Sequence, residues 1–290
     1  MNNMAFSNGF SGDSKSLNYI LQTLEAKQVL IPGVTSNPNL QVSAGGEVAY
    51  FYTRGASSIT SGTNTLGSQI SYTSSGVTRV DVNLVNAIQI GAVIPYVNFA
   101  TVEASVIADK VIQESLAAAN TWNEKAIAFL EANATNFYKN ADGTIVTTSV
   151  SNNATLAATT VYAEIVNMKK AFNVANKAKG MKPTAIIVSE AVNALLLQSD
   201  EFIRKEQAGD TTVHEGIVGR VAGLQVVVSQ DMVEDIIMLN AEALAAPVNV
   251  KSLVIADATA AGYPGGVIVA GEIGYGFKIG DPDLVLMREA

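Results

Sequence analysis

The alternation of apolar and polar positions predicts a long helix near the middle of the chain. Residues 101–133 place apolar and polar side chains on opposite faces of a 3.6-residue period. The apolar face consists of Ile107, Val111, Ala118, Trp122 and Phe129. Thr101 is suited to cap the helix, and Glu103 lies in its first turn, where a negative charge is favoured. Such a helix would span about 48 Å, so we expect it to be the spine of an elongated structure.

Residues 46–95 predict a long β-hairpin. One strand is expected at residues 47–52, which are rich in β-branched and aromatic side chains, and another at residues 77–84, which alternate with period two. The intervening residues 55–76 are rich in Ser, Thr and Gly. Loops of about 20 residues are uncommon inside compact domains. This segment is therefore either a surface loop or an arm that packs on a neighbouring molecule.

The chain before the hairpin is polar, and the chain after the spine predicts an α/β region. Within residues 1–45 only residues 15–28 have helical spacing, and Pro32 and Gly33 would stop such a helix. Residues 155–230 predict a helix from Thr160, a buried strand at 184–188, a short helix at 190–198 and a strand pair at 216–229. The last third alternates strand-like runs with turns, at residues 251–256, 266–270 and 284–287.

Composition narrows the function without identifying it. The chain has 290 residues, of which 48% are hydrophobic and only 15% charged, against about 25% charged in average soluble domains. It has no cysteine, which excludes disulfides and thiolate metal sites. The net charge of −8 argues against tight or specific DNA binding, although loose contact with DNA remains compatible with it. The first residues lack the pattern of a secretory signal.

The sequence contains no complete set of catalytic or metal-binding side chains. We therefore expect no catalytic, cofactor-binding or metal-binding residues and no cofactor. His214 is the single histidine, and no second ligand stands at a spacing that would form a metal site with it. The sequence also lacks the G-x-S-x-G motif of a serine nucleophile. The acidic pairs Glu234/Asp235 and Asp281/Asp283 are interpreted as turn and helix-end charges. No phosphate-binding loop is present, and the glycines at 216, 219 and 223 precede a β-branched run, which predicts strands with glycine at turns.

The order of these segments resembles the major capsid proteins of tailed bacteriophages, of the Hong Kong 97 type. The resemblance centres on the A-domain segment, with D-E-F-I-R at residues 200–204, a polar loop, and G-I-V-G-R-V-A-G-L-Q-V-V-V-S at residues 216–229. P-T-A-I-I-V-S at residues 183–189 is similar as well, and G-Y-G-F-K-I-G-D-P at residues 274–282 resembles the final strand region. The hairpin resembles the family's E-loop, the long helix its spine helix and the polar start its N-arm.

The resemblance implies an α+β fold with a defined order of parts. These parts are an N-arm at 1–45, an E-loop hairpin at 46–95, a P-domain with the spine helix at 96–150, an A-domain at 151–270 and a strand returning to the P-domain at 271–290. Some members join subunits by an isopeptide bond from an E-loop lysine to an asparagine. Residues 46–90 contain no lysine, so no such bond is expected there.

The function implied is structural and not enzymatic: a subunit that assembles into an icosahedral shell around phage double-stranded DNA. Its expected partners are copies of itself in hexamers and pentamers, a portal, a separate scaffolding protein and loosely contacted DNA, with no membrane. The expected location is the virion, after assembly in the bacterial cytoplasm. Two alternatives stay open: an encapsulin-type compartment shell that encloses enzymes, and a small-molecule enzyme with an α/β core at residues 155–230.

Overall fold

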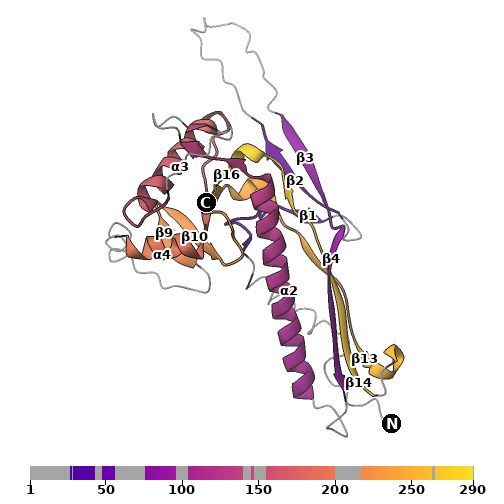
Figure 1. Cartoon of the computed structure of the whole chain (residues 1–290). Coiled ribbons are helices and arrows are strands. Elements are labelled where there is room, and N and C mark those ends of the chain that lie inside the picture. The colour runs from indigo at the N-terminus through magenta and orange to yellow at the C-terminus, as the bar shows by residue number, and fades with distance from the viewer. Residues whose placement is uncertain are drawn as a thin grey trace, which may run out of the picture.

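The computed structural model describes residues 27, 29–42, 48–55, 76–95, 104–139, 145–146, 155–199, 217–262 and 265–289. These residues form an elongated molecule in which a long helix runs beside a narrow sheet (Figure 1). A wider sheet with two helices lies near the carboxyl end of the long helix, and a β-ribbon extends from the same region. The helix predicted at residues 15–28 lies outside the described residues except for Lys27.

Helix α2 (Ala104–Asn133) and the narrow sheet form the long axis of the molecule. The sheet consists of three antiparallel strands in the order β13 (Val248–Asp257), β14 (Gly266–Tyr275) and β4 (Asn86–Pro95). Because side chains alternate between the two faces of a strand, one face presents a continuous apolar set to α2. The predicted spine helix is thus confirmed from residue 104 onward; residues 101–103 lie outside the described residues.

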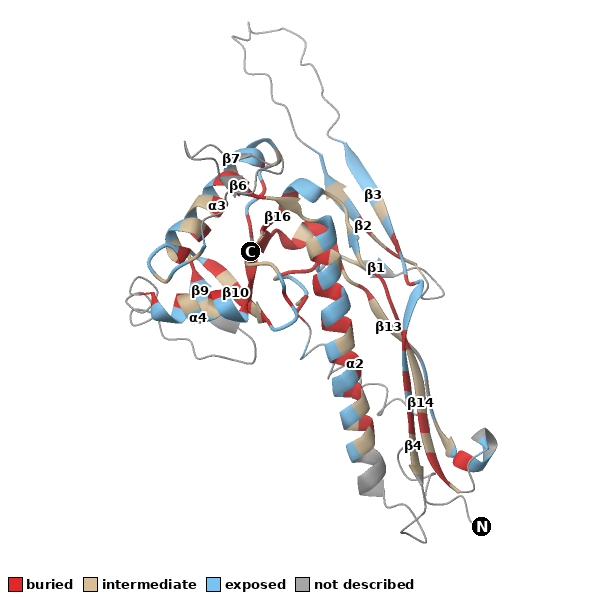
Figure 2. Ribbon diagram, in the orientation of Figure 1, coloured by how far each residue is buried: buried red, intermediate tan, exposed pale blue. Residues whose placement is uncertain are grey.

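Trp122 lies at the centre of the packing between α2 and the narrow sheet. Its side chain is fully buried, and its ring meets Phe277 edge-on at a centroid distance of 5.3 Å. Val111 and Ala118 are also buried, as their place on the predicted apolar face requires. Figure 2 shows this burial along one side of α2 and on the strands beside it. A buried aromatic pair of this kind contributes about 1 kcal/mol beyond the area that it removes from water.

The wider sheet has six strands in the order β5-β16-β11-β8-β10-β9. Their bounds are β5 (Thr135–Asn136), β16 (Val285–Arg288), β11 (Ile236–Leu239), β8 (Ala185–Ser189), β10 (Leu224–Ser229) and β9 (Ile217–Val221). All five residues of β8 are buried, and β8 is an interior strand that pairs in parallel with β10 on one side and antiparallel with β11 on the other. A short strand that is apolar throughout is typical of such an interior position.

Helices α3 (Val161–Ala175) and α4 (Glu190–Gln198) pack on the wider sheet. The predicted stripe of α3 is confirmed, since Val161, Ile165, Met168 and Phe172 are all buried. Ser189 caps α4 by accepting a hydrogen bond from the backbone N–H of Val192 at 3.4 Å. Two short strand pairs complete the fold: β6 (Tyr138–Lys139) with β7 (Ile145–Val146), and β12 (Leu244–Ala245) with β15 (Lys278–Ile279).

The β-ribbon is a three-stranded antiparallel sheet of β1 (Gln41–Val42), β2 (Val48–Arg54) and β3 (Val77–Asn83). The predicted pairing of the two longer strands is confirmed. At the outer end the backbone N–H of Gly55 donates to the Gly76 carbonyl at 2.7 Å. A Cβ on Gly55 would lie 2.5 Å from that carbonyl oxygen, so only glycine fits there.

Two boundaries of the expected parts fall differently in the structure. The region expected as a hairpin, residues 46–95, includes β4, which pairs with β14 in the narrow sheet instead of with the ribbon. The chain leaves the ribbon at Leu84, which is buried, and Val85, which is 80% exposed. The boundary expected at residue 270 lies inside β14, whose ten residues all pair with β4. Continuous pairing makes a division there unphysical, because cutting the strand would break its ladder.

Candidate assembly surfaces

The segment before the ribbon is tied to α2 through one buried side chain. Asn123 accepts a hydrogen bond from the Val29 backbone N–H at 2.9 Å and donates one to the Lys27 carbonyl at 2.7 Å. Val29 and Leu30 are buried beside it. Farther along, the Asn37 backbone N–H donates to the Leu244 carbonyl at 2.7 Å. These contacts give the chain a fixed direction where it enters the body of the molecule.

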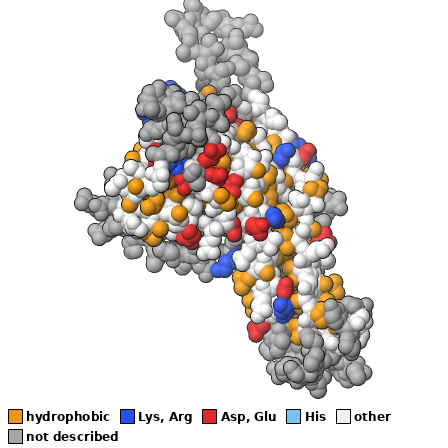
Figure 3. Space-filling view, viewed as in Figure 1, with side chains coloured by type: hydrophobic (Ala, Val, Ile, Leu, Met, Phe, Trp, Pro, Cys, Tyr) orange, Lys and Arg blue, Asp and Glu red, His pale blue; other side chains and the backbone are white. Residues whose placement is uncertain are grey.

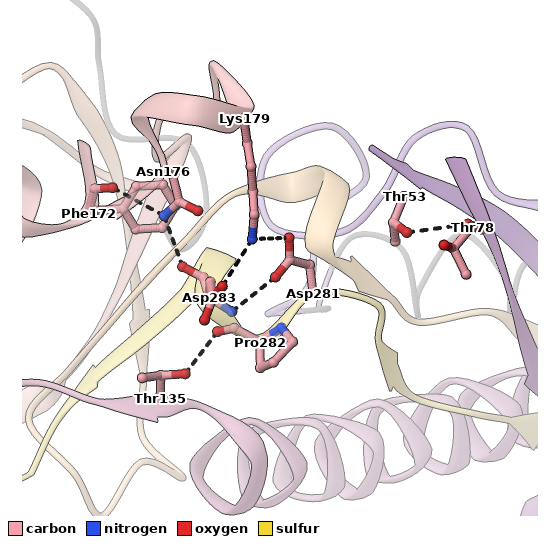
Figure 4. Close-up of polar contacts among 9 residues, drawn as sticks. All are labelled: Thr53, Thr78, Thr135, Phe172, Asn176, Lys179, Asp281, Pro282 and Asp283. Atoms are coloured by element: carbon pink, nitrogen blue, oxygen red, sulfur yellow. Dashed lines mark hydrogen bonds and ion pairs between the residues drawn. The ribbon is translucent and has the colours of Figure 1, made fainter. Parts of the chain in front are cut away.

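A polar junction at residues 281–283 joins the wider body to the spine (Figure 4). The Lys179 ammonium donates to Asp281 at 2.6 Å and to Asp283 at 3.0 Å. Asp281 also caps the short turn that follows it by accepting from the Asp283 backbone N–H. The hydroxyl of Thr135, just beyond α2, donates to the Pro282 carbonyl at 3.0 Å. The interpretation of Asp281/Asp283 as turn and helix-end charges is confirmed.

The electrostatics of this junction favour a charged lysine. Burial acts against the charge of Lys179, but the hydrogen bonds and charges of Asp281 and Asp283 outweigh it, so the pKa of Lys179 is raised above its ordinary value of 10.5. The side chain of Lys179 is only 17% exposed. Lys179 therefore acts as the cation of a structural ion pair. A lysine that serves as a catalytic base has a lowered pKa instead.

The second acidic pair, Glu234/Asp235, also has a structural role. Asp235 pairs with Arg288, whose side chain is 2% exposed, and the Arg288 guanidinium lies 3.7 Å from Glu164 of α3. Burial raises the pKa of Asp235, and the positive charge of Arg288 opposes that shift. The pair therefore holds β16, the start of β11 and α3 together. Arg288 directly follows the apolar run of residues 284–287, and a charge at the end of such a run is the sequence signal for this buried ion pair.

The glycines considered as a nucleotide loop form a hairpin turn. Ala222 and Gly223 connect β9 to β10, and both have positive φ, at 51° and 79°. Two consecutive positive φ values define the tight turn that suits the twist of a β-hairpin. The predicted strand pair with glycine at its turn is confirmed. Lys169 of α3 donates to the Ala222 carbonyl at 2.6 Å and holds the turn against the helix.

The remaining chemical candidates do not gather into a site in the part of the chain that the structure describes. No group of three or more His, Cys, Asp or Glu residues there could hold a metal ion. Among the same residues, no helix is both long and apolar enough to cross a membrane. His214, residues 200–204 and residues 56–75 lie outside the described residues. The expected absence of catalytic and cofactor-binding residues stays a prediction.

What the described chain offers instead is contact surface. On the ribbon, Tyr52 is 53% and Val77 62% exposed, and the Arg79 guanidinium lies 4.2 Å from the ring centre of Tyr50. Charged side chains occur in small groups among apolar and neutral ones on the face drawn in Figure 3. Exposed aromatic and arginine side chains are the types that anchor protein interfaces.

The fold is that of known capsid proteins. The structure is similar to the capsid of cyanophage P-SCSP1u, with a TM-score of 0.58 and 16% identity over 86% of this chain and 85% of that one. It is similar to the mature capsid of bacteriophage PhiM1, with a TM-score of 0.53 and 15% identity over 86% and 83%. A virus-like particle from Pyrococcus furiosus matches with a TM-score of 0.52 and 10% identity over 95% and 98%.

The sequence matches no protein-family model and no curated protein sequence. The similarity is therefore carried by the structure, and it confirms the expected α+β fold of the Hong Kong 97 type. It extends over most of the length of each chain.

Proposed function

We propose that this protein is the major capsid subunit of a tailed bacteriophage. It assembles with many copies of itself into an icosahedral shell that encloses double-stranded DNA. The observation that carries the proposal is the likeness to phage capsid structures over more than four fifths of the chain. The protein acts through complementary surfaces and not through catalysis. Stable contacts between proteins commonly bury about 1,200–2,000 Å² each.

The architecture supports a division of labour within such a subunit. Residues up to about 45 would form the N-arm, and the ribbon of β2 and β3 would form the E-loop. The spine helix with the narrow sheet would form the P-domain, and the wider sheet with α3 and α4 the A-domain. With β4, β13 and β14 assigned to the P-domain, that domain takes segments from two parts of the chain: β4 with α2, and β13 with β14.

The proposed partners follow from this role. Copies of the chain would form hexamers and pentamers, with a portal at one vertex and a separate scaffolding protein during assembly. The net charge of −8 fits loose and non-specific contact with packaged DNA. The protein would assemble in the bacterial cytoplasm and reside in the virion.

A second candidate is a compartment shell of the encapsulin type. It is favoured by the likeness to the virus-like particle from Pyrococcus furiosus, which covers 95% of this chain and 98% of that one. The content of purified particles separates the two candidates: phage DNA supports the capsid, and a cargo enzyme without nucleic acid supports the compartment.

The experiment that tests the proposal is electron microscopy of the purified protein with and without residues 56–75, which connect β2 to β3 in the sequence. Residues 56–75 are replaced by Asn-Gly, because Gly55 and Gly76 are already hydrogen-bonded and a two-residue turn can close between them. We expect closed shells from the natural chain and none, or misshapen ones, from the variant. A control replaces the same residues by a Gly/Ser segment of equal length. Absence of particles from the natural chain contradicts the proposed function, and normal shells from the shortened variant contradict the role of the ribbon.

A further inference from the structure

The outward face of α3 is an open groove with an unusual concentration of lysine. It is lined by Val166, Lys169, Lys170, Asn173, Val174 and Lys177 and encloses about 530 Å³. Val166 is 41% and Val174 69% exposed. Three of its six lining residues are lysines, and none is an aspartate or glutamate. In a chain of net charge −8, this groove is a local positive surface with an apolar strip along it.

The groove's cations are available for a partner. Lys170 and Lys177 are exposed, and no carboxylate pairs with either among the described residues. Lys169 reaches only a neutral carbonyl, that of Ala222. A ligand that fits must therefore bring negative charge and an apolar group.

A second surface of the same chain has the opposite character. The connection between β10 and β11 exposes Val233, which is 77% accessible, between Asp231 and Glu234. A carboxylate oxygen of Glu131 on α2 accepts from the backbone N–H groups of Val233 and Glu234 at 2.8 and 3.0 Å. These two bonds hold the connection in place, so that Val233 is presented without an ordering cost at binding. We call residues 231–234 the Val233 loop.

The charge around the Val233 loop is unfavourable in the isolated chain. Burial and the nearby negative charge of Glu124 raise the pKa of Asp231. An approaching ammonium group would relieve that repulsion. The two surfaces are thus complementary in two respects: the groove's lysines face carboxylates, and its two exposed valines face a valine.

We propose that the α3 groove of one subunit receives the Val233 loop of a second copy of the chain. This inference rests on the proposed shell function and specifies one contact within it. Because the two surfaces differ, the contact is head-to-tail, which is the type that closes into rings of one repeated chain. DNA fits less well, since a phosphate backbone offers no apolar group to Val166 and Val174.

Charge reversal with rescue tests the pairing. We expect Lys170→Glu with Lys177→Glu, and separately Asp231→Lys with Glu234→Lys, each to raise the protein concentration needed for half assembly about tenfold or more. The chain with all four changes should recover most of that loss, because the charges again oppose each other. Sedimentation velocity measures the assembled fraction. Lys182→Glu, an exposed lysine outside the groove, is the matched control and should assemble normally.

Crosslinking gives a second readout that does not depend on charge. The chain has no cysteine, so Val174→Cys with Val233→Cys places two thiols without background. A short bis-maleimide should give a ladder of linked subunits from the double variant and only dimers from either single variant. Circular dichroism of unassembled chains checks that every variant is folded.

The outcomes separate the possibilities. Reversed variants that are folded and assemble at the natural concentration, or a four-residue variant that shows no recovery and no crosslinked ladder, overturn the inference. The groove variant could also form empty shells normally but retain less DNA when the shells are filled. That result would assign the groove to DNA and would also overturn the inference. If the natural chain assembles, any of these failures leaves the proposed function standing; if it does not, the function itself has failed.

Discussion

The wider sheet and the β-ribbon differ in how their strands are stabilised. In the wider sheet β8 is buried on both faces and paired on both edges, and every one of its residues belongs to the core. The ribbon shares only a small cluster with the body, formed by Ala49, Phe51, Val82, Leu84 and Ala245. Beyond it, both faces of the ribbon are exposed. The wider sheet can therefore hold its shape within one chain, whereas the outer ribbon gains little from packing within the chain, and under the proposed function a neighbouring subunit would cover it.

The largest expected effect is in the wider sheet. Ile187→Ala removes three buried carbon atoms from the central strand, and we expect the free energy of unfolding to fall by about 4 kcal/mol. Urea denaturation of the unassembled chain measures it. Val77→Ala in the ribbon is the control, because Val77 is 62% exposed and should cost less than about 0.5 kcal/mol. Equal losses at both positions would refute the contrast between the two regions.

The junction between ribbon and body should respond to a single methyl group. A Cβ on Gly280 would lie 2.9 Å from ring carbons of Phe51, which belongs to the ribbon's cluster. We expect Gly280→Ala to cost about 2 kcal/mol through overpacking and to turn the ribbon away from the body. Amide hydrogen exchange should rise in β2 and β3 but not in β8. Gly91→Ala, which meets no atom within 4 Å, is the control, and faster exchange in β8 would contradict local displacement.

The smallest expected effect concerns the ion pair of Lys179. Because its pKa is raised in the folded chain, the pair stabilises the fold below the unfolded pKa near 10.5 and loses this contribution as the pH rises through the higher folded value. Lys179→Met should therefore lower stability by about 1 kcal/mol at pH 7. Urea midpoints at pH 7 to 12 should converge for the two chains at the alkaline end. A constant difference over that range would show that packing, and not charge, is responsible.

The local elements were predictable because their causes are local. Nearby residues decide the apolar stripe of α2, the uninterrupted apolar run of β8 and the tight turn at Ala222 and Gly223. The acidic pair Asp281/Asp283 was also interpreted correctly, since Asp281 caps its own turn, whereas the ion pair of Asp235 with Arg288 was not predicted. His214 and the polar loop predicted at residues 199–215 lie outside the described residues, apart from Ser199.

The partners of these elements were decided only in the tertiary structure. A strand's alternation sets which side chains share a face but not which strand lies beside it, so β4 was grouped with the ribbon that precedes it although it pairs with β14, about 180 residues away. Arg288 likewise has partners 53 and 124 positions away in sequence, and nothing near it indicates them. The sequence by itself determined the elements, their order and the resemblance that they carry. The tertiary structure decided how they pair, because long-range pairing depends on the packing of the whole chain and not on the residues of any one segment.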